Sequence, residues 1–157
     1  HSCTLLPTLH RSRARETTVS VVTRTRNRPD ALRTALNSLA WQTFRDFEVV
    51  VVNDGGDDVE GLLKEYEEHL SVRYVHNESG KGRALAANDG VEAARGRFIA
   101  YLDDDDVVYP FHLASLVRAA ERLEPASAFV YTHYNRVLLS GQEAGGSERE
   151  AGGCVGW

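Results

Sequence analysis

The sequence predicts an α/β fold in which a mostly parallel sheet carries helices on both faces. The alternation of two kinds of segment leads to this prediction. Short runs of β-branched and apolar residues alternate with longer segments whose apolar residues recur at helical spacing. This alternation is what a parallel sheet requires, because each parallel strand is reached by a crossover that is usually a helix. The length of 157 residues suits one domain.

The first part of the chain predicts a strand, a helix and a second strand. Thr18–Thr23 is β-branched and apolar, which favours a strand. Pro29 and Asp30 then suit the start of a helix, and apolar residues recur at helical spacing as far as Trp41. Phe47–Val52 is a continuous apolar run, which is typical of a strand that is covered on both faces.

The middle of the chain continues the alternation. A helical stripe of apolar residues runs from Val59 to Leu70, and Val72–His76 predicts a short third strand. A helix over Arg83–Ala94 and a strand over Phe98–Leu102 follow.

The last predicted elements come after four consecutive aspartates. Pro110 opens a helix that ends before Pro125, and Ala128–Tyr134 predicts a further strand. Beyond it the chain is rich in glycine and glutamate and has no periodic pattern. The predicted regions are a flexible basic leader over 1–17, a domain over 18–139 and a flexible glycine-rich tail over 140–157.

Composition and charge exclude several classes of protein. With 42% hydrophobic residues, 26% charged residues and a formal net charge of -5, the chain has an ordinary globular composition that argues against a dedicated nucleic-acid surface. Its apolar runs fall short of the roughly 18 residues that a membrane helix needs. Cys3 and Cys154 lack the spacing of a zinc site or a disulfide framework. We therefore predict a cytoplasmic protein, compatible with a place at the inner membrane surface, whose oligomeric state stays open.

The run Asp103–Asp106 places a dense negative charge at the end of a predicted strand. Carboxylates packed side by side repel one another and raise each other's pKa. A divalent cation bound through hard oxygen ligands would relieve this repulsion. The alternative is a solvated acidic turn, because carboxylates are also natural residues at a helix start. The run lacks the sixth-position glycine of an EF-hand loop, which excludes that kind of calcium site.

Polar turns follow three of the predicted strands. In an open α/β sheet, ligands bind outside the carboxyl ends of the strands, so these turns mark the expected binding edge. The nearby Gly80-Lys81-Gly82 segment is not a P-loop, because no Ser or Thr follows the lysine and the upstream glycine is missing. The three turns are Arg24–Arg28, Asn53–Asp58 and Asp103–Asp106.

Five segments occur in a characteristic order: Val19–Arg28, Trp41–Phe44, Phe47–Gly55, Gly82–Gly90 with Asn88 inside it, and Gly96–Asp106 followed by Pro110. Together they resemble the N-terminal, nucleotide-sugar-binding half of family 2 glycosyltransferases, and the aspartate segment resembles the family's DXD motif. The resemblance covers about Thr18 to Arg118. It implies the Rossmann-like GT-A architecture, which we expect to be truncated after the DXD region.

The resemblance also implies roles for single residues. Asp54 would accept a hydrogen bond from the base, since a carboxylate suits a uracil N–H. Asp105, together with Asp103, would bind Mn²⁺ or Mg²⁺ bridging the donor diphosphate. The alternative for Asn27 and Asp54 is that they cap turns. The residues implied in binding the nucleotide sugar are Thr25, Asn27, Asp54, Lys81, Arg83 and Asp104.

The activity that the resemblance implies is metal-dependent transfer of a sugar, as in polysaccharide biosynthesis. The donor would be a nucleotide-diphosphate sugar, with a UDP-sugar favoured, and the acceptor a hydroxyl of a sugar, a lipid-linked sugar or a glycan. Inversion at the anomeric carbon would need a general base. Glu143, Glu148 and Glu150 do not match the family's base motif, so no base is assigned. The alternative is a non-catalytic nucleotide-sugar-binding module, or a fragment without the acceptor half.

Two departures from the family pattern concern the donor site. Asn53 stands where the family often has an aspartate, and Arg24 and Arg26 replace the usual proline and tyrosine around Thr25. Extra arginines at the mouth of a pocket would favour an anionic ligand. They lead to the hypothesis of a more anionic donor or acceptor.

Overall fold

The strands form a single sheet in the order β4-β3-β2-β5-β1-β6. The computed structural model describes residues 4–7, 17–122 and 130–131. Within them, β2 pairs in parallel with β3 and with β5, and β3 pairs in parallel with β4. β1 pairs antiparallel with β5 and with β6. The strand bounds are β1 Thr4–Pro7, β2 Thr17–Thr25, β3 Phe47–Asp54, β4 Ser71–Asn77, β5 Gly96–Tyr101 and β6 Val130–Tyr131.

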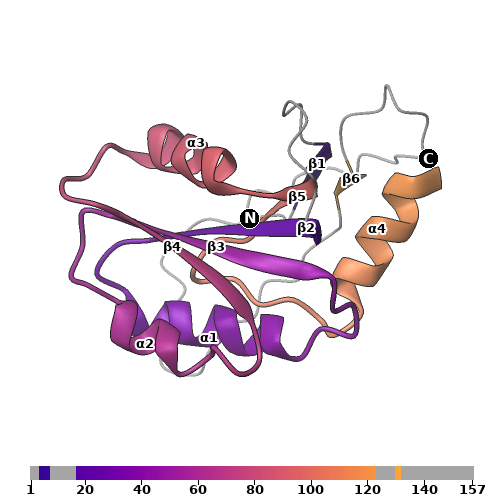
Figure 1. Ribbon diagram of the computed structural model, residues 1–157, viewed down its shortest axis with the longest axis horizontal. Coiled ribbons are helices and arrows are strands. Elements are labelled where there is room, and N and C mark those ends of the chain that lie inside the picture. The colour runs from indigo at the N-terminus through magenta and orange to yellow at the C-terminus, as the bar shows by residue number, and fades with distance from the viewer. Residues whose placement is uncertain (1–3, 8–16, 123–129, 132–157) are drawn as a thin grey trace, which may run out of the picture.

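Helices lie on both faces of this sheet, which confirms the predicted α/β architecture. Figure 1 shows α1 and α2 on one face and α3 on the other, with α4 beyond one end of the strands. The helix bounds are α1 Pro29–Ala40, α2 Glu60–Lys64, α3 Arg83–Ala93 and α4 His112–Arg122.

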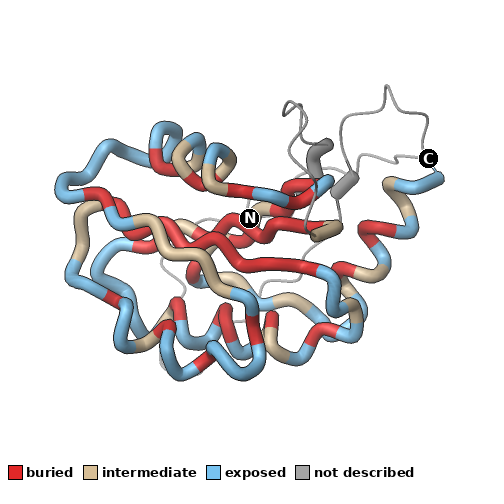
Figure 2. Tube along the Cα trace, viewed as in Figure 1, coloured by how far each residue is buried: buried red, intermediate tan, exposed pale blue. Residues whose placement is uncertain are grey.

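Each face of the sheet has its own apolar core. On β2, Val19 and Val21 belong to the core under α1, whereas Val22 belongs to the core under α3. This division follows from the alternation of side chains along a strand. Every residue of β3 is buried, as predicted for a strand covered on both faces, and Figure 2 shows the buried strands between exposed helix surfaces. A Cβ at Gly90 of α3 would lie 2.4 Å from Val22 Cγ1, so glycine permits the close packing of that helix.

Helix α2 is much shorter than the predicted helix from Val59 to Leu70. It ends at Lys64, after which the backbone N–H groups of Glu65 and Tyr66 bond to carbonyls three residues back. Tyr66 and Leu70 are nevertheless buried in the core. The apolar spacing therefore predicted which side chains are buried, but it did not predict the hydrogen-bond pattern of the backbone.

Strand β1 lies within the segment that was predicted as a flexible leader. Thr4–Pro7 extends the sheet antiparallel to β5, a pairing between residues far apart in sequence that local composition does not reveal. The predicted strand at 128–134 is represented by Val130–Tyr131, which pairs with β1. Residues 1–3 and 8–16 of the leader, the tail over 140–157 and the three glutamates Glu143, Glu148 and Glu150 lie outside the described residues.

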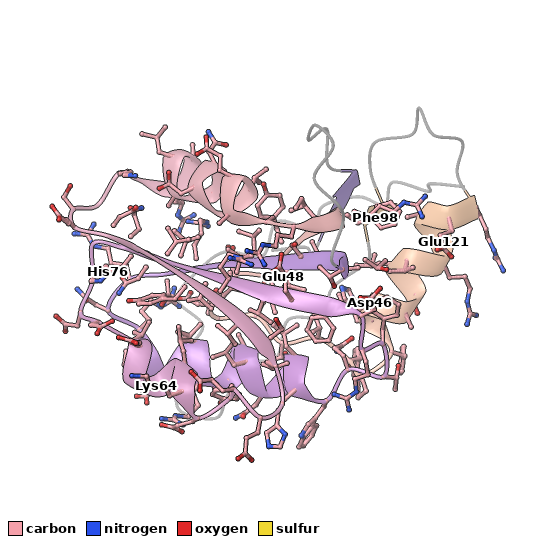
Figure 3. All side chains as sticks on the ribbon, in the orientation of Figure 1. Asp46, Glu48, Lys64, His76, Phe98 and Glu121 are labelled. Atoms are coloured by element: carbon pink, nitrogen blue, oxygen red, sulfur yellow. The ribbon has the colours of Figure 1, made fainter. Side chains whose placement is uncertain are left out.

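The parallel strands bring the predicted binding turns together. β2, β3, β4 and β5 all point the same way, so their carboxyl ends lie at one edge of the sheet. Thr25 is in register with Asn53, and Asp54 is in register with Asn77. In Figure 3, His76 near the end of β4 and Asp46 just before β3 lie at opposite ends of the sheet and so mark its carboxyl and amino edges.

Candidate functional site at the carboxyl edge of the sheet

A hydrogen bond joins the ends of β2 and β5. The buried hydroxyl of Thr25 donates to Asp104 Oδ2 at 2.8 Å. Asp104 is only 5% exposed, and burial raises its pKa, an effect that the Thr25 hydroxyl and the Arg28 guanidinium partly offset. The structure therefore places these two predicted donor-site residues together, with Asp104 as the buried member of the aspartate run.

The neighbouring carboxylates are more open to solvent. The side chain of Asp105 is 50% exposed and that of Asp103 is 29% exposed. The hydrogen bond from Arg28 holds the pKa of Asp105 below its usual range, whereas burial and then repulsion from its neighbours raise the pKa of Asp106. One short turn therefore carries carboxyl groups in different environments.

Two arginines from the end of β2 contact the aspartate run. Arg24 Nη2 lies 2.9 Å from Asp103 Oδ1. The Arg28 guanidinium spans two aspartates, with Nη1 3.1 Å from Asp104 Oδ1 and Nη2 2.7 Å from Asp105 Oδ2. Arg28 was not among the predicted site residues. Its place in the turn after β2, beside β5 in a parallel sheet, is the signal that could have identified it.

Asp54 anchors the loop that precedes α3. Its Oδ1 accepts the Lys81 N–H at 2.7 Å, and its Oδ2 accepts the Gly82 N–H at 3.0 Å. Burial raises the pKa of Asp54, but these backbone donors outweigh it and the net pKa is lowered. The observed contacts correspond to the turn-capping alternative for Asp54. The Asp54 carboxylate can accept further hydrogen bonds, so its contact with a nucleotide base stays a prediction.

Asn27 also contacts the protein's own backbone. It has a positive φ of 53°, a conformation that asparagine tolerates better than most residues. Its Oδ1 accepts the Asp57 N–H at 2.7 Å, while Asn53 Oδ1 accepts the Gly56 N–H at 3.0 Å. Asn27 thus joins the turn after β2 to the turn after β3, and Asn53 closes the turn after β3.

The predicted phosphate-binding cations lie at the start of α3. Lys81 Nζ is 3.0 Å from Asp89 Oδ2, and the same oxygen accepts a hydrogen bond from Asn77 Nδ2 at 2.8 Å. Arg83 is exposed at the first position of the helix. Arg26 packs over the same loop, since a Cβ at Gly80 would lie 2.6 Å from Arg26 Nη1.

The opposite edge of the sheet holds a different polar region. Buried Glu48 accepts hydrogen bonds from Ser20 Oγ at 2.6 Å and from the Arg95 N–H at 2.7 Å. A cavity of about 250 Å³ lies beside it. The cavity is lined by Thr17, Arg45, Asp46, Phe47, Glu48, Ser71, Arg73 and Arg95.

The polar turns thus gather at the carboxyl edge of the parallel strands, which is where open α/β folds bind their ligands. Among the described residues, no three His, Cys, Asp or Glu side chains form a group that could hold a metal ion on their own. The family model described as "Glycosyl transferase family 2" matches residues 20–143. This chain belongs to glycosyl transferase family 2.

Curated relatives agree with this assignment. An uncharacterized glycosyltransferase of Rickettsia felis is 30% identical over 142 residues, which cover 90% of this chain and 23% of that protein. The uncharacterized glycosyltransferase YibD of Escherichia coli is 35% identical over 104 residues, covering 65% of this chain and 30% of that protein. The chain therefore spans about a quarter to a third of the length of these two relatives.

Solved structures support the GT-A fold. The S. aureus protein TarS, crystallised as residues 1–349 with UDP, superposes with a TM-score of 0.62 and 29% identity over 66% of this chain and 32% of that chain. The mannosyltransferase PcManGT of Pyrobaculum calidifontis, in complex with GDP-Man and Mn²⁺, has a TM-score of 0.53 and 22% identity, covering 65% of this chain and 30% of that chain, which supports the fold alone. Of the helices that the structure describes, none combines the length and the apolar character needed to cross a membrane.

Proposed function

We propose that this chain is the donor-binding part of a glycosyltransferase that moves a sugar from a nucleotide-diphosphate donor to an acceptor hydroxyl. One observation carries the proposal. The Thr25–Asp104 hydrogen bond brings the turn after β2 against an aspartate run whose Asp103 and Asp105 side chains are still reached by solvent. This juxtaposition lies at the sheet edge where α/β folds bind nucleotides.

The donor that we favour is a UDP-sugar. TarS has been crystallised with UDP and with UDP-GlcNAc, at 29% identity to this chain in both structures. Thr25 and Asn27 would line the nucleotide pocket, and Asp54 would add a uracil N–H to the two backbone donors it already accepts. Asp54 is 9% exposed, so a base would contact the small part of this residue that solvent reaches.

The residues at this edge fit a divalent cation of the hard, oxygen-binding kind. Mg²⁺ is usually held by one or two carboxylates together with substrate phosphates, not by a complete protein cage. Asp105 and Asp103 supply two such carboxylates, and their exposure leaves room for phosphate oxygens. A bound Mn²⁺ or Mg²⁺ would offset the negative charge of the leaving diphosphate.

Two cations of this chain would complete the neutralisation of the diphosphate. Lys81 has a side chain that is 45% exposed and pairs with Asp89, so it can turn toward a phosphate. Arg83 is exposed two residues further along the chain, at the first position of α3. A guanidinium or an ammonium near phosphate oxygens makes charge-assisted hydrogen bonds, which are stronger than neutral ones.

The remaining steps of the transfer would be carried by parts of the protein beyond these residues. We propose inversion at the anomeric carbon, with a general base that deprotonates the acceptor hydroxyl. No base is assigned among the described residues. We propose that the acceptor is a sugar, a lipid-linked sugar or a glycan at the inner surface of the membrane. Donor binding without transfer is the competing function.

Calorimetric titration with UDP and then GDP, in Mn²⁺ and again in chelator, tests the donor site. We expect UDP binding in Mn²⁺ that disappears in chelator and on Asp105→Ala. The matched control is Glu92→Ala, which removes an exposed carboxylate from α3 and should leave binding unchanged. Failure of a folded wild-type protein to bind either nucleotide would refute the proposal. Release of UDP from UDP-GlcNAc in the presence of acceptor would separate an enzyme from a binding module.

A further inference from the structure

Arg28 bridges two neighbouring carboxylates of the aspartate run. Its Nη1 and Nη2 reach Asp104 Oδ1 and Asp105 Oδ2, at 3.1 and 2.7 Å respectively. The hydrogen bond to Asp105, and then the charge of Asp104, raise the pKa of the guanidinium above its ordinary value. Arg28 is therefore the principal counter-charge of these two aspartates within the described residues.

The two arginine contacts at this edge differ in how far they are open to solvent. The Arg24 side chain, paired with Asp103, is 22% exposed, whereas that of Arg28 is 48% exposed. Arg28 also lies outside the regular elements, directly before the first residue of α1, and makes no side-chain cap of that helix. Its guanidinium can therefore leave the aspartates without breaking a strand or a helix.

A divalent cation bound to Asp105 would lie close to the Arg28 guanidinium. Mg²⁺–oxygen distances are about 2.0–2.1 Å, and the guanidinium lies 2.7 Å from one oxygen of the same carboxylate. Two positive charges held on one small carboxylate group repel each other, to an extent that water reduces at this half-exposed site. Occupation of Asp105 by the cation and by Arg28 at the same time is therefore unfavourable.

We propose that Arg28 is a positioning residue that competes with the divalent cation for Asp105. In the metal-free protein it holds the Asp104 and Asp105 carboxylates, and it must leave Asp105 when the cation binds. Arg28 thereby weakens the intrinsic metal affinity, so that firm metal binding requires the additional oxygens of the donor diphosphate. This inference rests on the proposed function of the site.

Titration with MnCl₂ in the absence of nucleotide tests the competition. We expect Arg28→Gln to bind Mn²⁺ about three- to tenfold more tightly than wild type, since a competing charge is removed. Arg28→Lys keeps the charge but loses the two-point contact, so its affinity should fall between the two. The matched control is Arg33→Gln on α1, because Arg33 pairs with Glu65 and not with the aspartate run.

Several results would overturn the inference. Equal or weaker Mn²⁺ binding by Arg28→Gln would mean that the guanidinium supports the metal site. If Arg28→Gln does not fold, the Mn²⁺ affinity of Arg28→Lys is compared with that of wild type instead. Absence of Mn²⁺ binding by wild type and by every variant would also refute it.

UDP titrations of the same proteins in Mn²⁺ distinguish failure of this inference from failure of the proposed function. If wild type binds UDP while the variants show unchanged Mn²⁺ affinity, only the competition fails, whereas absence of UDP binding contradicts the proposed function.

Discussion

The two edges of the sheet hold carboxylates in opposite ways. At the amino edge, Glu48 is 5% exposed and accepts hydrogen bonds from the Ser20 hydroxyl and the Arg95 backbone. At the carboxyl edge, the Asp105 side chain is 50% exposed and is contacted by the equally open Arg28 guanidinium. Glu48 is buried among three donors, the Ser20 hydroxyl, the Arg95 N–H and the Arg73 guanidinium, whereas half-exposed Asp105 is paired with the half-exposed Arg28 side chain.

This difference separates a structural carboxylate from one that is available to ligands. Loss of a buried acceptor leaves its donors without partners, which is costly. Loss of an exposed ion pair costs little, because water replaces the partner. We therefore expect the stability of the fold to depend on the amino edge and ligand binding to depend on the carboxyl edge.

The largest expected effect is on stability at the amino edge. Glu48→Ala would leave the Ser20 hydroxyl, the Arg95 N–H and the nearby Arg73 guanidinium without their acceptor. We expect a loss of about 3 kcal/mol in the free energy of unfolding, measured by urea denaturation. Glu68→Ala, which removes an exposed glutamate, is the control. A loss below about 0.5 kcal/mol in the free energy of unfolding would mean that Glu48 is not a structural residue, and the two edges would then not differ in this respect.

Asp54 should give an intermediate effect that depends on pH. Its folded pKa is lowered, so its stabilising contribution is present above the unfolded pKa of about 3.9 and is lost as the pH falls through the folded pKa. Asp54→Asn should cost about 1–2 kcal/mol at pH 7, because one backbone N–H loses its acceptor. Urea denaturation at pH 7 and below pH 4 should show the difference from wild type shrinking with acid. A difference that grew toward low pH would contradict this assignment.

The smallest expected change in stability is at the aspartate run. Asp105→Ala removes a half-exposed ion pair and also relieves repulsion among neighbouring carboxylates, so the free energy of unfolding should change by less than about 0.5 kcal/mol. The same variant should lose metal-dependent UDP binding. Thermal unfolding and calorimetry on one preparation measure both quantities. Strong destabilisation would mean that Asp105 belongs with Glu48 as a structural residue.

Periodicity and turn chemistry predicted much of this molecule. The apolar run over Phe47–Val52 predicted a strand buried on both faces, and the polar turns that follow the strands lie together at one edge of the sheet, as their order predicted. The ordered segments predicted the family, which the match over residues 20–143 confirms. These features are local, since a residue's own spacing and its neighbours carry the information.

Only the tertiary structure decided which groups contact each other. The Thr25–Asp104 and Arg28–Asp105 contacts join residues 79 and 77 positions apart, and their existence depends on the parallel pairing of β2 with β5. The same is true of β1, which is a strand because β5 offers it an edge, and of α2, whose apolar stripe is buried although the helix ends early. Local sequence therefore determined which side chains are apolar, which are charged and where the turns fall. Long-range packing determined which charge neutralises which, because the energies of those contacts depend on distance and burial that no local pattern encodes.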